Sequence, residues 1–212
     1  MIVTDAVRSY LDQTRPEPDA LLAEMQERGA RDSVPILDAQ AATLLQVLAR
    51  AVGARRIVEV GTAIGVSTLH LARALPADGE LISFEIDRER HTQALSYFAR
   101  ARLPARVDLR LQDAAEGLTQ VEGPFDFAFL DGLKAEYAGH LDLIVPLMRP
   151  GGLLAVDNVL MSGAVAEGRP IDGWSGDRVA TARSFNDHFL GHPQLDGLIT
   201  PIGDGLALAV RR

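Results

Sequence analysis

Short apolar runs rich in β-branched and aromatic residues alternate along the chain with segments of helical periodicity. Strands separated by helices of this length form βαβ units, so the pattern predicts a parallel sheet with helices on both faces. The expected strands, most of which end at acidic residues, are 55–61, 80–87, 106–113, 125–132 and 152–159. The expected helices between them are 66–75, 88–102 and 135–148.

Both ends of the chain extend this core. Residues 1–52 predict three helices, interrupted at "RPEP" and at "SVP". The last segment, "LDGLITPIGDGLALAVRR", predicts an antiparallel hairpin around "GDG". Residues 160–178 are polar and glycine-rich and predict a loop. Because no repeat or linker is evident, we expect residues 1–212 to form a single domain, with N-terminal helices in 1–52 and the α/β core in 53–212.

Composition and charge narrow the possible functions. The 212 residues carry a formal net charge of -8, with a pI near 5.1, which argues against a nucleic-acid partner. The absence of cysteine excludes disulfides and thiolate metal sites. The start of the chain has acidic residues and no apolar core, so it does not read as a signal peptide, and no apolar run is long enough to span a membrane. We therefore expect a cytoplasmic protein with no membrane partner.

A glycine loop follows the first strand of the core. "VEVGTAIGVST" places Gly61 and Gly65 between a strand and a helix, where the backbone and the helix amides can approach a ligand closely. Ala63 stands where the dinucleotide fingerprint needs its second glycine. Glu59 would repel a pyrophosphate but suits a cationic ligand such as S-adenosylmethionine (SAM). The alternative is a turn that merely uses glycines.

Acidic residues end the next two strands. Glu85 could accept both ribose hydroxyls of a nucleoside, whether in SAM or in a nicotinamide cofactor. Asp87 reads as the N-cap of the following helix. Asp113 is a candidate for an adenine amino group or, equally, for a loop. His70 and His91 read as helix surface.

Three oxygen ligands follow the fourth and fifth strands. Asp131 ends one strand, and Asp157 and Asn158 end the next. If these strands are neighbours, the three side chains meet at the carboxyl edge of the sheet, where ligands bind in such folds. Two carboxylates and an amide suit Mg²⁺, Mn²⁺ or Ca²⁺, of which Mg²⁺ is the expected ion, and do not suit zinc. The alternative is that they cap helices or line a turn.

Lys134 is the only lysine, since the other 20 of the 21 basic residues are arginine. It lies three residues after Asp131, and a neighbouring divalent cation would favour the neutral form of its amine. A neutral amine can accept a proton, whereas arginine stays charged. The position therefore favours a catalytic base over a solvated surface lysine.

At these residues the chain resembles the cation-dependent O-methyltransferases typified by catechol and caffeoyl-CoA O-methyltransferases, and most of all their small bacterial relatives. The resemblance runs over nearly the whole chain and is most specific in the D-x-x-K-x-x-Y of "FLDGLKAEY" and the D-N pair of "AVDNV". It implies a Rossmann-like fold with a seven-stranded sheet, metal ligation by Asp131, Asp157 and Asn158, and deprotonation of the acceptor by Lys134. The residues that would bind SAM are Glu59, Gly61, Thr62, Gly65, Ser67, Glu85, Asp113, Ala114 and Asp131.

The resemblance also implies the substrate class and the assembly. We expect methyl transfer from SAM to a hydroxyl of a vicinal diphenol, a small phenolic acceptor that chelates the divalent cation, and we expect a homodimer. Many relatives carry G-T-G-T-G-Y-S in the glycine loop, and the tyrosine of that motif is Val66 here. Asn186 is the residue that bacterial relatives place near the second hydroxyl of the diphenol. Trp174 either forms a wall of the acceptor pocket or packs its loop onto the rest of the protein.

Two alternatives remain open from the sequence. One is a methyltransferase that needs no metal, with Asp157 and Asn158 in structural roles. The other is a nucleotide-binding regulatory domain without catalysis, which would have no need to keep the full set of Asp131, Lys134, Asp157 and Asn158.

Overall fold

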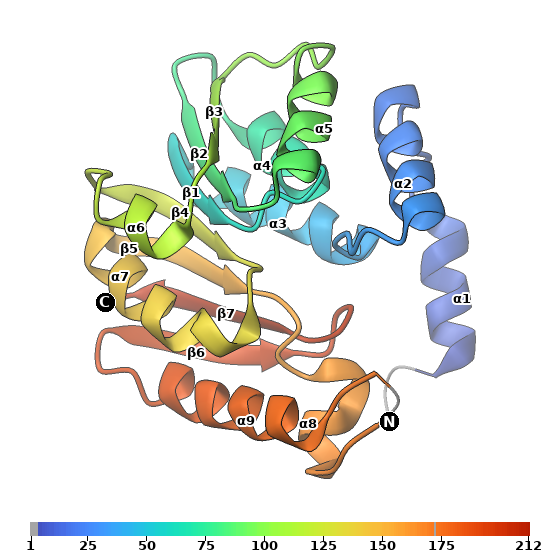
Figure 1. Ribbon diagram of the computed structural model, residues 1–212, viewed down its shortest axis with the longest axis vertical. Coiled ribbons are helices and arrows are strands. Elements are labelled where there is room, and N and C mark those ends of the chain that lie inside the picture. The colour runs from blue at the N-terminus through green and yellow to red at the C-terminus, as the bar shows by residue number, and fades with distance from the viewer. Residues whose placement is uncertain (1–3, 172) are drawn as a thin grey trace.

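One seven-stranded sheet runs through the computed structural model, which describes residues 4–171 and 173–212 (Figure 1). The strand order is β3-β2-β1-β4-β5-β7-β6, and β7 runs opposite to the other strands, so that it pairs antiparallel with both β5 and β6. This confirms the predicted α/β class with its C-terminal antiparallel pair. The strands are β1 (Arg56–Val60), β2 (Glu80–Glu85), β3 (Arg106–Leu111), β4 (Phe125–Leu130), β5 (Met148–Val156), β6 (Leu195–Thr200) and β7 (Leu206–Arg211).

Helices cover both faces of this sheet because the central strands alternate the direction of their apolar side chains. In β4, Phe127 and Phe129 pack on one face with α3 (Ala39–Ala51) and α4 (Val66–Ala74). Ala128 and Leu130 pack on the other face, against helices that follow later in the chain. Those helices are α6 (Ala114–Leu118), α7 (Tyr137–Leu147) and α9 (Gly176–Leu190). The sheet is therefore buried on both sides, as the βαβ pattern predicted.

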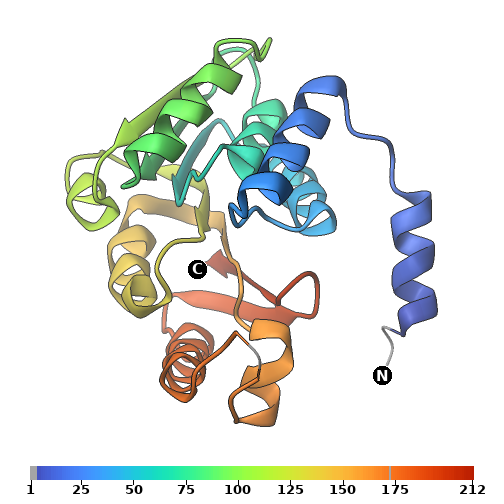
Figure 2. The ribbon, with the colours of Figure 1, turned by 45° about the vertical axis from the view of Figure 1, so that its right-hand side comes forward.

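The N-terminal segment contains α1 (Asp5–Thr14), α2 (Ala20–Asp32) and α3, divided near the two predicted interruptions. Met25 of α2 packs with Ile64 and Leu69, from the glycine loop and α4. Figure 2 shows α1 apart from the rest of the molecule, beyond an extended segment. Residues 1–3, which begin the predicted N-terminal helices, lie outside the described residues.

Side-chain caps fix where several helices begin. Asp87 Oδ1 accepts hydrogen bonds from the amides of Glu89 at 2.8 Å and Arg90 at 3.0 Å, which confirms the predicted cap of α5 (Arg88–Phe98). The same kind of cap begins α1, α2, α3, α6 and α9, at Thr4, Asp19, Asp38, Asp113 and Ser175. Each cap satisfies amides that have no partner within the helix.

Three predictions from the pattern need correction. Residues 160–178 are not one loop: they contain the short helices η2 (Met161–Gly163) and α8 (Ala164–Glu167) and the first residues of α9, while Asp172 lies outside the described residues. Strand β5 begins at Met148, before the predicted position 152. His70 is not on the surface: it is 8% exposed, and its Nδ1 lies 3.0 Å from Gln46 Oε1, because α3 covers that side of α4.

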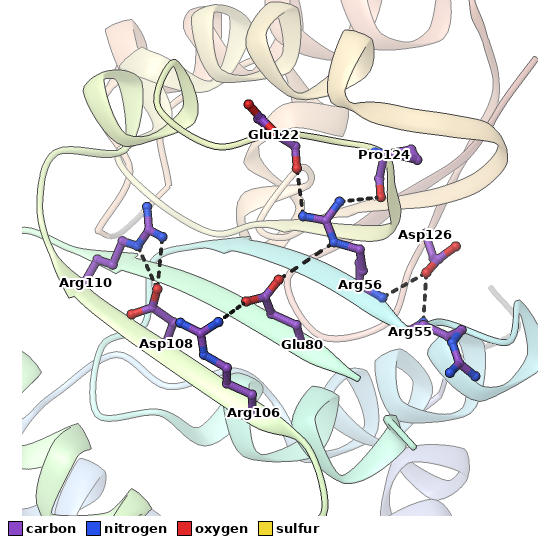
Figure 3. Close-up of polar contacts among 9 residues, drawn as sticks. All are labelled: Arg55, Arg56, Glu80, Arg106, Asp108, Arg110, Glu122, Pro124 and Asp126. Atoms are coloured by element: carbon purple, nitrogen blue, oxygen red, sulfur yellow. Dashed lines mark hydrogen bonds and ion pairs between the residues drawn. The ribbon is translucent and has the colours of Figure 1, made fainter. Parts of the chain in front are cut away.

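Charged residues tie the amino-terminal ends of the strands together (Figure 3). Glu80 of β2 pairs with Arg56 of β1 and Arg106 of β3. Asp126 of β4 accepts hydrogen bonds from the amides of Arg55 and Arg56, both at 2.8 Å. Burial alone would raise the pKa of Asp126, but these bonds and one from Arg149 outweigh it and hold that pKa below its usual range.

No helix in residues 4–171 and 173–212 combines the length and apolar character needed to cross a membrane.

Replacing Asp126 with alanine should lower the free energy of unfolding by about 2–4 kcal/mol, because two backbone amides and one guanidinium lose their acceptor. The stabilisation is present at neutral pH and is lost as the pH falls through the lowered pKa of Asp126. Chemical denaturation at pH 7 measures the loss. The matched control is Asp78→Ala, which removes only an exposed ion pair with Arg55 and should change stability by less than about 0.5 kcal/mol. Equal effects of the two substitutions would contradict this account.

Candidate functional site

The chain leaves the sheet in opposite directions at the carboxyl ends of β1 and β4. Strand β1 pairs with β2 on one side and with β4 on the other, and the loops after β1 and β4 diverge from this point. A crevice for ligands forms at such a reversal in α/β sheets. Gly61 follows β1, and Asp131 follows β4 with its amide bonded to the Val60 carbonyl at 2.8 Å.

A cavity of about 260 Å³ lies at this edge. All three predicted metal ligands border it, together with Lys134 and five of the predicted cofactor residues. The five are Gly61, Glu85, Asp113, Ala114 and Asp131, while Glu59, Thr62, Gly65 and Ser67 lie outside the lining. The sequence prediction missed several other residues of the wall, including Pro35, Ile36, Arg90, Glu136 and His140.

Gly61 allows the loop after β1 to pass directly over the chain after β4. Its φ is +95°, and a Cβ atom built on it would lie 2.0 Å from the carbonyl oxygen of Asp131. No side chain fits in that space. The close approach therefore holds the glycine loop against Asp131, so that both border the same cavity.

Glu59 lies behind the loop, outside the lining of the cavity. It is fully buried, and its carboxylate accepts hydrogen bonds from Ser67 at 2.6 Å, Ser83 at 2.7 Å and Thr68. Thr62 bonds in turn to Ser83. Burial raises the pKa of Glu59 to about 7 against the opposing effect of these hydroxyl groups. Glu59, Thr62 and Ser67 thus join β1, β2 and the start of α4 behind the cavity wall.

Glu85 both shapes the loop and borders the cavity. Its carboxylate accepts hydrogen bonds from the amides of Ala63 at 2.7 Å, Ile86 at 3.0 Å and Asp87 at 2.9 Å. A carboxylate offers about four acceptor positions. These three bonds leave roughly one position for a ligand hydroxyl, fewer than the two that the sequence suggested.

The predicted metal ligands converge from β4 and β5. Asp157 is 5% exposed; its Oδ2 accepts a hydrogen bond from Asn158 Nδ2 at 2.8 Å, and its buried Oδ1 has no hydrogen-bond partner among the described residues. Burial, and then the nearby Asp131 carboxylate, raise the pKa of Asp157 to about 7. The described residues contain no group of three or more His, Cys, Asp or Glu side chains that could hold a metal ion. The predicted set has two carboxylates and one amide, so it is not of that kind.

Lys134 begins the short helix η1 (Lys134–Glu136), directly after the loop that follows β4. Its Nζ donates to Asp131 Oδ1 at 3.0 Å and to the Gly132 carbonyl at 3.2 Å, which holds the amine at the cavity. Tyr137, one turn later, donates its hydroxyl to the Asp157 carbonyl at 3.2 Å. Burial, with Asp131 and Asp157 nearby, raises the pKa of Tyr137 above its usual range, so this donor stays protonated.

Comparison with known proteins assigns the chain to a family. Residues 13–212 match the family described as O-methyltransferase. A catechol O-methyltransferase from Niastella koreensis is 34% identical over 220 residues, which cover 98% of this chain and 97% of that protein. The chain belongs to the O-methyltransferase family. The resemblance inferred from the D-x-x-K-x-x-Y and D-N residues is confirmed, and with it the expected class of enzyme, a SAM-dependent O-methyltransferase.

Further relatives agree with this assignment. The crystal structure of the O-methyltransferase from Bacillus cereus in complex with SAH has a TM-score of 0.84 and 30% identity, and the match covers 98% of this chain and 97% of that one. Tricin synthase 2 from Oryza sativa subsp. japonica is 32% identical over 176 residues, and the matched region spans 79% of this chain and 60% of that protein.

Two residues that the sequence placed near the acceptor of this O-methyltransferase pack within the fold. Trp174 packs against the apolar cluster of Met161, Ala164, Val165, Val179 and Ala182, so it holds its own loop. Asn186 is buried and donates to the Val159 carbonyl at 2.8 Å. Neither residue borders the cavity.

Replacing Gly61 with alanine should lower the free energy of unfolding by roughly 3 kcal/mol or more and should weaken binding of SAH, because β1 and β4 must separate to admit the methyl group. The matched control is Gly53→Ala. Gly53 also has a positive φ, of +65°, but an added Cβ meets nothing within 4 Å, so the cost should be only the left-handed backbone, about 1 kcal/mol.

Chemical denaturation and calorimetric titration with SAH measure the two effects for this O-methyltransferase. If the alanine variants of Gly61 and Gly53 were equally stable and bound SAH equally well, the close approach would not be the constraint that positions the loop.

Proposed function

We propose that this O-methyltransferase transfers the methyl group of SAM to one hydroxyl of a vicinal diphenol, and that the reaction depends on a divalent cation, expected to be Mg²⁺. The single observation that carries the proposal is the meeting of Lys134, Asp131, Asp157 and Asn158 at one cavity beside the glycine loop. A nucleotide-binding domain without catalysis has no need of such a set.

The side chains at this edge suit a hard cation. Within the described part of the chain, one buried carboxylate oxygen of Asp157 has no hydrogen-bond partner, and a second carboxylate nearby makes its negative charge costly. Carboxylate and amide oxygens from Asp131, Asp157 and Asn158 are the ligands that Mg²⁺ prefers. When bound, such a cation would lower the pKa of a phenol that coordinates it.

Lys134 would remove the proton of the acceptor hydroxyl. Its bond to Asp131 and its place in a short helix hold Nζ at the cavity, within the same wall as the proposed ligands. In its neutral form the amine would take the phenolic proton, the phenolic oxygen would form a bond to the methyl carbon of SAM, and the carbon–sulfur bond would break to release S-adenosylhomocysteine (SAH). The chain's main contribution is to position these groups, since the step needs no covalent intermediate.

The glycine loop and the ends of β2 and β3 would hold SAM. Gly61, Glu85, Asp113 and Ala114 all border the cavity from this side. The similarity to the Bacillus cereus enzyme in complex with SAH supports this assignment. The predicted homodimer stays a prediction.

Lys134→Arg should lower the single-turnover rate with saturating SAM and catechol by roughly 10²–10⁴-fold at neutral pH, because arginine keeps the positive charge but cannot accept the proton. The residual rate should rise with pH as hydroxide replaces the base, and SAH affinity should stay close to that of the wild type.

Mass spectrometry of the wild-type products should show a single methyl on vicinal diphenols and none on monophenols. A panel of vicinal diphenols that gives no methylated product would contradict the proposed acceptor.

The Lys134→Arg variant distinguishes the positive charge of Lys134 from its ability to accept a proton. If Lys134 were only an ion-pair partner of Asp131, arginine would replace it almost without effect. A variant within about threefold of the wild-type rate at pH 7, well short of the effect of a lost general base, would show that Lys134 is not the base.

A further inference from the structure

His140 of α7 borders the cavity, and its ring has no hydrogen-bond partner among the residues that the structure describes. The residue is 2% exposed, and neither Nδ1 nor Nε2 makes a hydrogen bond among the described residues. Buried polar groups without partners are costly, and native proteins rarely keep them without a reason. A ligand in the cavity would supply the missing partner.

The His140 ring is neutral because it is buried, although two carboxylates lie near it. Glu136 Oε2 lies 4.0 Å from Nε2, beyond hydrogen-bond distance, and the Asp113 carboxylate is engaged with the amide of Glu116 at 3.0 Å. Burial lowers the pKa of His140 despite these two carboxylates. A neutral imidazole offers one hydrogen-bond donor and one acceptor.

The position of His140 indicates which part of the ligand it meets. It shares the cavity wall with Asp113 and Ala114, which begin α6, and α6 packs on α7. Asp113 is the predicted candidate for binding the adenine amino group, and Ala114 is predicted to lie near SAM. A purine base carries ring nitrogens that accept hydrogen bonds and an amino group that donates them, which matches the two orphaned nitrogens of the ring.

We propose that His140 hydrogen-bonds the purine base of SAM. The inference rests on the proposed function and adds a binding residue that the sequence motifs do not mark. It also accounts for a polar ring buried in α7 between apolar neighbours, at a place where phenylalanine would cost less in the free protein.

Calorimetric titration with SAH tests this contact without any need for turnover. His140→Phe keeps an aromatic ring but removes both nitrogens, and the Kd for SAH should rise about 3- to 10-fold, the scale of one uncharged hydrogen bond. In the absence of ligand, the thermal midpoint of the variant should equal or exceed that of the wild type, because two orphaned polar atoms disappear.

His70→Phe is the matched control. His70 is also buried, but its ring bonds to Gln46 and does not border the cavity. This substitution should lower the thermal midpoint and leave the Kd for SAH unchanged. The opposite pattern in the two variants distinguishes a ligand contact from a general effect of removing a buried histidine.

Analogues of SAH altered in the base identify the contact. The probes are the 6-deamino compound and the 1-, 3- and 7-deaza compounds, each of which removes one hydrogen-bonding group. At least one analogue should bind equally well to the wild type and to His140→Phe, because that analogue lacks the group of the base that His140 would contact. An unchanged Kd for SAH in His140→Phe, or the same loss with every analogue, would overturn the proposal and leave the proposed function standing. Failure of the wild type to bind SAH would overturn both.

Discussion

The approach of Gly61 to the carbonyl oxygen of Asp131 joins the two halves of the site. It brings the loop after β1 against the chain after β4, at the point where the sheet reverses its strand order. The residues proposed to hold SAM lie on the β1 side, and Lys134 with the proposed metal ligands lies on the β4 side. Because the two loops touch through a glycine, one cavity can present both sets of groups to a methyl donor and an acceptor.

A second layer of buried polar groups supports that contact. The Glu59 carboxylate gathers hydroxyl groups from α4 and β2 behind the glycine loop, and Glu85 binds the loop amide of Ala63. On the other side, the Tyr137 hydroxyl binds the backbone of Asp157, and Asp131 holds Lys134. These bonds fix side chains that would otherwise sample several rotamers, which is the condition for catalysis by positioning. His140 differs from these residues, since neither of its ring nitrogens has a hydrogen-bond partner in the described residues, and the proposed contact with the ligand would supply one.

The sequence predicted the sheet well because its signals are local. Alternating strands and helices, glycines after β1 and acids at strand ends all depend on a few neighbouring residues, and the motif of Asp131 and Lys134 identified the family. Contacts between distant segments left weaker signals. For Glu59 the sequence indicated only a role toward the ligand, because it did not show that Ser67, Thr68 and Ser83 surround the carboxylate. Helix α6 was not predicted, because its five residues are too few to show a helical period. The burial of His70 was not predicted, because it depends on α3, which lies some 20 residues earlier in the chain.

The most direct test of the central claim is the dependence of methyl transfer on a divalent cation. The rate from SAM to catechol is measured after EDTA removes divalent cations and again after Mg²⁺ is restored, while the Kd for SAH is followed under both conditions. If Asp131, Asp157 and Asn158 hold the cation that activates the acceptor, the rate should fall to background in EDTA and return with Mg²⁺, with little change in SAH affinity. An undiminished rate in EDTA would contradict the account and would leave these residues with structural roles in a methyltransferase that needs no metal.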